Sequence, residues 1–194
     1  MSHAFDAASA AAATHTTAEP RVPGLLGTID RALKGVNHVI MLLGGIAGTP
    51  RAKTVVIGGG FLRHGGSAEQ KAAHIPSIID GSKTLAFAQT EKNSRYDLFD
   101  VTTTAKKDGG SFVLDGEKAW ITSGAHAGLH VVFARTAPPD EGGASNKRGI
   151  GCFVVERGTP GLHVGKDEDK MGQRASGTVA LAFDACRVPE ENLL

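Results

Sequence analysis

Residues 99–124 read FDVTTTAKKDGGSFVLDGEKAWITSG, and this stretch decides the fold class of the chain. Near its start, Val101, Thr103 and Ala105 alternate with two further threonines. Successive side chains of a β-strand point to opposite faces, so this period-two pattern predicts strands with two different faces.

Two turn signals divide the same stretch. The run Lys107–Gly110 (KDGG) predicts a hairpin turn, and Asp115-Gly116 predicts a second one. The only tryptophan, Trp120, lies beyond both, followed by a β-branched residue, two hydroxyls and a glycine. A tryptophan of the core prefers apolar neighbours, so these polar neighbours are unusual for a buried tryptophan.

Further strands are predicted on both sides. The runs KTLAFAQTE, LHVVFAR, GIGCFVVE and GTVALAFDACRV are apolar and short, and they occupy residues 83–91, 129–135, 149–156 and 177–188. A polar loop (137–148) and a turn (157–161) separate three of them. Short strands with turns at this spacing predict an antiparallel barrel or sandwich.

Before residue 83 the patterns are helical. Apolar residues recur three and four apart within 27–45, and residues 53–63 predict a second helix weakened by three glycines. Ser67 and Gln70 form a capping-box signature for a third helix, which Pro76 is expected to kink or divide. The fold class is therefore α+β and mainly β: a flexible tail (1–24), a helical part (25–82) and a β-barrel domain (83–194).

Composition excludes several classes of function. The 194 residues carry a net charge of +1, so no basic field for nucleic acid exists. Cys152 and Cys186 are far apart and are expected to be reduced thiols, and the eight histidines lack metal-ligand spacing. Residues 1–20 lack the pattern of a secretory signal and no apolar run is long enough to span a membrane, so we expect a cytoplasmic protein.

Three segments in order carry a family resemblance. They are GSAEQKAAHIPSIIDGSKTLAFAQTE (66–91), DGGSFVLDGEKAWITSG (108–124) and KMGQRASGTVALAFDACRVPEENLL (170–194). Their order and spacing resemble the acyl-CoA dehydrogenase family, whose members oxidise the Cα–Cβ bond of an acyl-CoA thioester with FAD. The resemblance implies a fatty-acid-metabolism flavoprotein, a β-barrel middle domain, a homo- or hetero-oligomer and electron transfer to an electron-transferring flavoprotein.

The resemblance also assigns site residues, position by position. Phe87, Gln89 and Thr90 match the strand that contacts the pyrimidine edge of the flavin. The motif residues Trp120, Ile121 and Thr122 match the segment that covers one face of the ring, with the threonine near N5. A flat ring with polar edges requires such an aromatic wall with short hydroxyls beside it.

The loop after Thr90-Glu91 departs from the family pattern at Lys92, Arg95 and Tyr96. Tyr96 and Arg95 are candidate substrate-binding residues, because this loop approaches the thioester in the family. Lys92 and Arg95 either pair with CoA phosphates or a dicarboxylate, or are ordinary surface cations. Both interpretations stay open from the sequence.

The chain ends at Glu190–Leu194, where the family's C-terminal helical domain begins. That domain supplies the catalytic carboxylate in the family, so no catalytic base is assigned here. We expect a fragment, a truncated reading frame or one piece of a split enzyme. The alternative function is a non-catalytic partner module that binds acyl-CoA or flavin without turnover.

Overall fold

The computed structural model describes residues 58–95, 97–138 and 149–194. Within these residues two helices precede seven strands and a short terminal 3-10 helix. In chain order they are α3 (Gly59–Gly65), α4 (Ala68–Ile79), β1 (Leu85–Ala88), β2 (Thr104–Asp108), β3 (Ser111–Thr122), β4 (Leu129–Arg135), β5 (Ile150–Glu156), β6 (Leu162–Asp167), β7 (Thr178–Pro189) and η2 (Glu190–Asn192).

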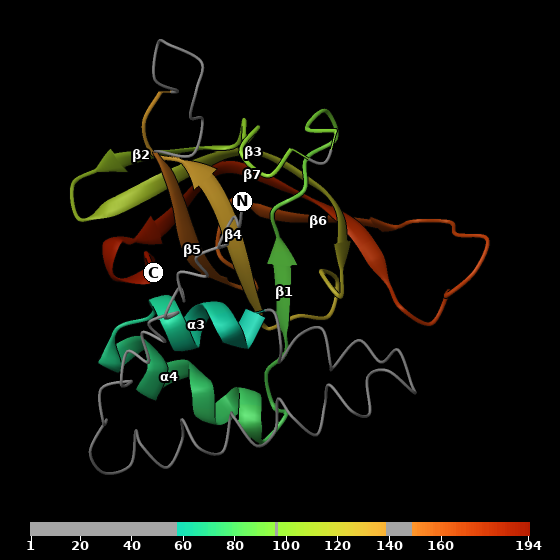
Figure 1. Ribbon diagram of the computed structural model, residues 1–194, viewed down its shortest axis with the longest axis horizontal. Coiled ribbons are helices and arrows are strands. Elements are labelled where there is room, and N and C mark those ends of the chain that lie inside the picture. Colours follow the sequence, from blue (N-terminus) through green and yellow to red (C-terminus); the bar gives the residue numbers. More distant parts are fainter. Residues whose placement is uncertain (1–57, 96, 139–148) are drawn as a thin grey trace, which may run out of the picture.

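The seven strands form one curled sheet, shown in Figure 1. The hydrogen-bonded order is β1-β4-β2-β3-β7-β6. Strand β5 lies outside this order and pairs with β4. The pairs β2–β3, β3–β7, β6–β7 and β4–β5 are antiparallel, whereas β1 and β2 both run parallel to β4. The prediction of an antiparallel barrel is therefore only partly right, because β1 enters from the helices and pairs with a strand that runs in its own direction.

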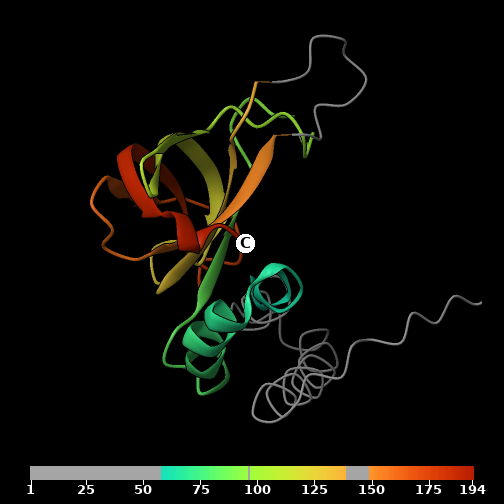
Figure 2. The same cartoon turned by 90° about the vertical axis from the view of Figure 1, so that its left-hand side faces the viewer.

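Two apolar clusters lie on the two faces of the sheet. The cluster inside the curl contains Phe112, Leu114, Phe153 and Leu181, among others. The second lies between the sheet and the helices and contains Leu62, Ile78, Leu85, Leu129, Val131 and Val154. Helices α3 and α4 lie together on this side of the sheet (Figures 1 and 2). Strand β4 contributes to both clusters, which explains why its apolar run is almost unbroken.

The predicted capping box begins helix α4. The Gln70 amide N–H donates to Ser67 Oγ (3.2 Å), and the Ser67 amide N–H donates to Gln70 Oε1 (2.6 Å). Pro76 does not divide the helix, which continues to Ile79. The helix predicted at 53–63 corresponds to α3 from Gly59 onward. Residues 53–57, the predicted tail and the predicted helix within 27–45 lie outside the described residues.

Strand boundaries confirm the first turn and correct the second. The chain turns at Gly109-Gly110 between β2 and β3, as predicted. At Asp115-Gly116, however, β3 continues without a turn. The register between β3 and β7 shifts here, because β7 has one extra residue opposite this point. The Ala185 N–H of β7 donates to Asp115 Oδ1 (2.8 Å). Strand β6 was not predicted, since nearly all of its side chains are exposed.

Both cysteines are free thiols, Cys186 buried and Cys152 half-buried. Burial raises the pKa of Cys152 to about 12 and that of Cys186 to about 11. Neither helix of the described residues is long and apolar enough to cross a membrane.

Candidate functional site

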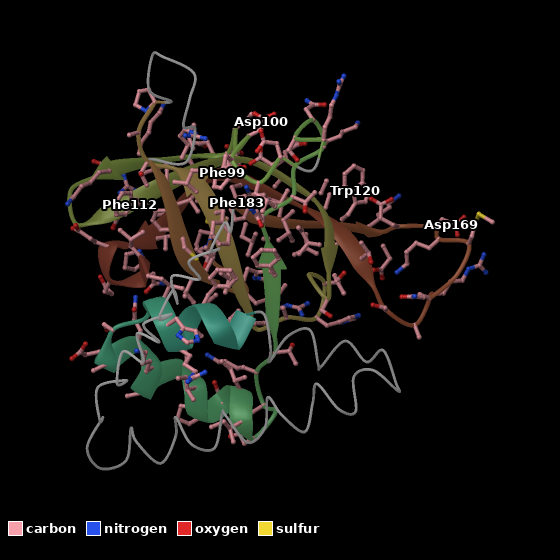
Figure 3. The ribbon with its side chains drawn as sticks, viewed as in Figure 1. Phe99, Asp100, Phe112, Trp120, Asp169 and Phe183 are labelled. Carbon is pink, nitrogen blue, oxygen red and sulfur yellow. The ribbon has the colours of Figure 1, made fainter. Side chains whose placement is uncertain are left out.

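Trp120 lies in a β-bulge of β3. The register with β7 passes from Lys118 opposite Leu181 to Ile121 opposite Val179, so β3 has one extra residue here. The backbone of Trp120 adopts a positive φ of 57°, and its side chain is 51% exposed. A bulge redirects the side chains that follow it. Figure 3 shows Trp120 away from the interior that holds Phe112 and Phe183.

The bulge also changes which positions of β3 are buried. Before it, the buried side chains are Phe112, Leu114 and Lys118, all at even positions, whereas Ile121 and Ser123 are buried after it. Without the extra residue, Trp120 would follow Lys118 into the interior, because residues two apart share a face. The bulge is therefore what exposes the tryptophan.

The end of β1 lies directly beside this bulge. The Ala119 amide N–H donates to the Thr90 carbonyl oxygen (2.9 Å), and the Gln89 side-chain amide donates to the Leu98 carbonyl (3.1 Å). The two segments that carry predicted cofactor residues are thus hydrogen-bonded neighbours, although nearly thirty positions separate them in the sequence. This confirms that the fold brings them together.

The remaining predicted cofactor residues lie in different surroundings. Ile121 is buried in the cluster inside the curl, and the Phe87 ring stacks on Phe61 (centroids 5.4 Å apart) on the helix side. Thr122 is half-buried and lies opposite Thr178 of β7. Neither the Thr122 nor the Thr90 hydroxyl bonds any residue that the structure describes. Trp120, Thr90 and Thr122, which we call the Trp120 surface, thus combine an exposed aromatic plane with two available hydroxyls.

A buried ion pair lies directly beneath this surface. Lys118 Nζ donates to Glu91 Oε1 at 2.6 Å, and the two side chains are 0% and 5% exposed. The same ammonium donates to the Gln89 carbonyl (3.2 Å). The Glu91 carboxylate also accepts from the backbone N–H and the hydroxyl of both Thr102 and Thr103. Every lone pair of this carboxylate therefore has a donor.

These contacts set the charge of the pair. Burial alone would raise the pKa of Glu91, but the Lys118 ammonium and the two threonines overcome it and hold the pKa at about 2. Burial lowers the pKa of Lys118, and the Glu91 carboxylate opposes that shift. Glu91 is therefore ionised at neutral pH, and Lys118 Nζ lies at hydrogen-bond distance from it.

The loop after Glu91 holds the predicted substrate residues. Arg95 is exposed with a positive φ of 47°, and Tyr96 lies outside the described residues. Arg135 anchors the later part of the loop through the carbonyls of Phe99 (2.7 Å) and Val101 (3.1 Å). Beside this anchor lies a hollow of about 440 Å³, lined among others by Val101, Thr104, Lys106, Arg135 and Pro138.

Sequence reasoning missed the role of Glu91 and Lys118, although both belong to quoted motifs. A usable signal was present: Lys118 has the same parity in β3 as Phe112 and Leu114, which places a lysine on the buried face. A lysine is almost never fully buried unless it is paired, so this position predicts a buried acidic partner.

Comparisons with known proteins agree with this geometry. The family model of the acyl-CoA dehydrogenase middle domain matches residues 86–186. An acyl-CoA dehydrogenase of Bacillus subtilis is 40% identical over 157 residues, covering 81% of this chain and 40% of the relative. The mitochondrial short-chain specific acyl-CoA dehydrogenase of Mus musculus is 46% identical over 129 residues, covering 66% and 30%.

A solved structure shows the same fold. The crystal structure of an acyl-CoA dehydrogenase from Geobacillus kaustophilus matches with a TM-score of 0.69 at 37% identity, over 74% of this chain and 37% of that one. The chain thus spans between 30% and 40% of the length of these relatives. With the family model covering more than half of its residues, the chain belongs to the acyl-CoA dehydrogenase family, and its matched strands correspond to the middle domain.

Proposed function

We propose that this chain binds FAD at the Trp120 surface, as the flavin-facing part of an acyl-CoA dehydrogenase. FAD is the cofactor of the family. The observation that carries the proposal is the bulge that exposes Trp120 beside two threonine hydroxyls not bonded within the described chain. An aromatic plane with adjacent donors fits a flat ring with polar edges.

Each residue then has a defined part in holding the ring. Trp120 forms a wall against one face, and the Thr122 hydroxyl donates to the polar edge near N5. The backbone of Gln89 and Thr90 contacts the pyrimidine edge. Ile121, buried inside the curl, and Phe87, stacked on Phe61 on the helix side, anchor these two segments. FAD held by these residues would supply a hydride acceptor for oxidation of the Cα–Cβ bond of an acyl-CoA.

FAD titration tests this proposal, with fluorescence of the single tryptophan as the readout. A ring stacked on Trp120 should quench its emission in a saturable manner. Thr122→Val should weaken FAD binding by about 1–3 kcal/mol, the cost of one lost hydrogen bond to a charged or polarised acceptor. Thr159→Val, in the turn between β5 and β6, is the matched control. Equal FAD affinity in both variants would contradict the assigned site.

We further propose that Arg95 and Tyr96 contact the acyl-CoA substrate, together with Lys92. The support is electrostatic: Lys92 and Arg95 are exposed cations on a loop that begins one residue after Glu91, beside the proposed ring. Arg95→Gln should raise the dissociation constant for an acyl-CoA several-fold and reduce its salt dependence. Arg157→Gln, an exposed arginine in the β5–β6 turn, is the control. If both variants bind alike, the loop is only a solvated surface.

A second candidate function is the non-catalytic partner module. It is favoured by the state of Glu91, the carboxylate that follows Thr90. Its donors hold it ionised and immobile, so it does not serve as a mobile base. The two functions are separated by mixing the chain with acyl-CoA, FAD and a dye acceptor. Dye reduction by this chain alone would exclude the module, and electron transfer to an electron-transferring flavoprotein would identify the acceptor.

A further inference from the structure

Glu91 and Lys118 are not among the residues that hold the ring in the FAD function proposed above, yet they are among the most buried charged groups that the structure describes. Taking two charges out of water costs several kcal/mol for each ion, and replacing such a pair by apolar residues is often neutral or stabilising. Stability alone is therefore a weak reason for placing an ion pair here. Its position beneath the Trp120 surface suggests a different reason.

The pair joins the three segments that meet at this surface. Glu91 directly follows Thr90, which lies two residues beyond the end of β1, and it accepts hydrogen bonds from Thr102 and Thr103, which lead into β2. Lys118 lies two residues before Trp120 in β3. The backbone bond from Ala119 N–H to the Thr90 carbonyl closes the connection. The start of the bulge is thus held by the side chain of Lys118 and by the backbone N–H of Ala119.

The ammonium also acts on a peptide group of the proposed ring-binding edge. Lys118 Nζ donates to the Gln89 carbonyl at 3.2 Å, and the N–H of that same peptide group belongs to Thr90. A charged donor on the carbonyl oxygen polarises the peptide and strengthens its N–H as a donor, an effect that is larger in a buried environment.

We propose that the Glu91–Lys118 ion pair is a positioning element, which holds the bulge so that Trp120 faces outward and polarises the Gln89–Thr90 peptide toward the bound ring. The first part depends only on the chain itself. The second part rests on the proposed FAD function. The two parts are therefore tested by different measurements.

The flavin-free test uses the full chain with Lys118→Met, Glu91→Gln and the double variant Lys118→Met/Glu91→Gln, in which the glutamine oxygen still accepts from Thr102 and Thr103. The readouts are the fluorescence anisotropy of Trp120 and hydrogen exchange at the Ala119 amide. We expect lower anisotropy and at least a tenfold faster Ala119 exchange in the single variants. The double variant leaves no unpaired buried charge, so it should recover thermal stability without recovering either readout.

Two controls separate positioning from general destabilisation. Lys107→Met/Glu190→Gln removes an exposed ion pair (2.5 Å) between β2 and η2, and Val188→Ala opens a cavity in β7 away from the bulge. Both should leave the anisotropy of Trp120 unchanged in the native state. Wild-type anisotropy and Ala119 exchange in a folded double variant would overturn the inference, and so would equal changes in the controls.

FAD titration then decides the second part. The double variant should bind FAD at least tenfold more weakly than the wild-type chain, and FAD affinity equal to wild type would overturn the polarisation. If the wild-type chain binds no FAD while the flavin-free readouts change as expected, the proposed function fails and the positioning of Trp120 is supported. The two failures are therefore distinguishable.

Discussion

Gly116→Ala is the substitution whose outcome the geometry defines most sharply. Gly116 has a φ of 141°, and a Cβ at this position would lie 2.7 Å from Thr103 Cα and 2.8 Å from Thr103 Oγ1. The first of these is a backbone atom, which cannot rotate away. The substitution should therefore destabilise the fold and displace Thr103, which is one of the two threonines that hold Glu91.

The magnitude follows from two costs and one gain. A side chain at this positive φ costs roughly 1–3 kcal/mol, and the close contact with Thr103 adds roughly 1–3 kcal/mol of overpacking. The loss of glycine's freedom in the unfolded chain returns about 0.4–1 kcal/mol. The net loss of about 1–6 kcal/mol is a substantial part of the 5–15 kcal/mol that is typical of a folded domain.

Urea unfolding measures this loss, followed by Trp120 emission and by far-UV circular dichroism. Gly110→Ala is the matched control, because nothing lies within 4 Å of a Cβ there and its φ is not positive. We expect the control to lie within about 0.5 kcal/mol of wild type, as surface substitutions usually do. If Gly116→Ala also lies within about 0.5 kcal/mol of wild type, the close approach of β3 to Thr103 is not real.

Two further predictions concern buried titratable groups. The pKa of Glu91 is about 2 in the folded chain against an ordinary 4.5, so its contribution to stability, on the order of 3 kcal/mol, is present above pH 4.5 and is lost as pH falls toward 2. Glu91→Gln should flatten the stability profile in this window, and an unchanged acid limb would contradict the ion pair. His130 is fully buried with Nε2 at 3.0 Å from the Gly124 carbonyl and no partner for Nδ1 among the described residues, and burial lowers its pKa. His130→Met should cost about 1–3 kcal/mol at pH 8, because the buried Gly124 carbonyl loses its donor, and it should remove part of the stability loss that wild type shows as pH falls below 6.5, both measured by thermal unfolding.

The hydrophobic pattern of the sequence predicted the strands that have one buried and one exposed face, and those that are buried on both faces. The alternation of Val101, Thr103 and Ala105 is borne out, since all three are buried while Thr102 is exposed. The apolar run 129–135 became β4 with the predicted limits. Burial creates these patterns, so they are visible in the sequence wherever a strand has a core on at least one side.

Other features depend on partners that are distant in sequence. Strand β6 has almost no buried side chain, so it carries no alternation and is held by hydrogen bonds to β7. Asp115-Gly116 has the composition of a turn, but both residues also suit this strand. Gly116 lets β3 pass close to Thr103, and Asp115 lies opposite the bulge in β7. The parallel pairing of β1 with β4 likewise follows from the path of the chain rather than from either strand alone.

The position of Trp120 among polar neighbours now has a structural explanation. Trp120 and Ser123 both adopt positive φ, at 57° and 63°, on either side of Ile121 and Thr122. For residues other than glycine such conformations cost of order 1–3 kcal/mol each, and they persist only where the surroundings enforce them. Here Ile121 is held in the core, and Ala119 and Ser123 are held by the carbonyls of Thr90 and Gly177. A tryptophan selected for burial would need none of this, because a regular strand would take its side chain inward after Lys118. The strained backbone is therefore the consequence of facing a large aromatic side chain outward from a strand whose neighbours stay in the core.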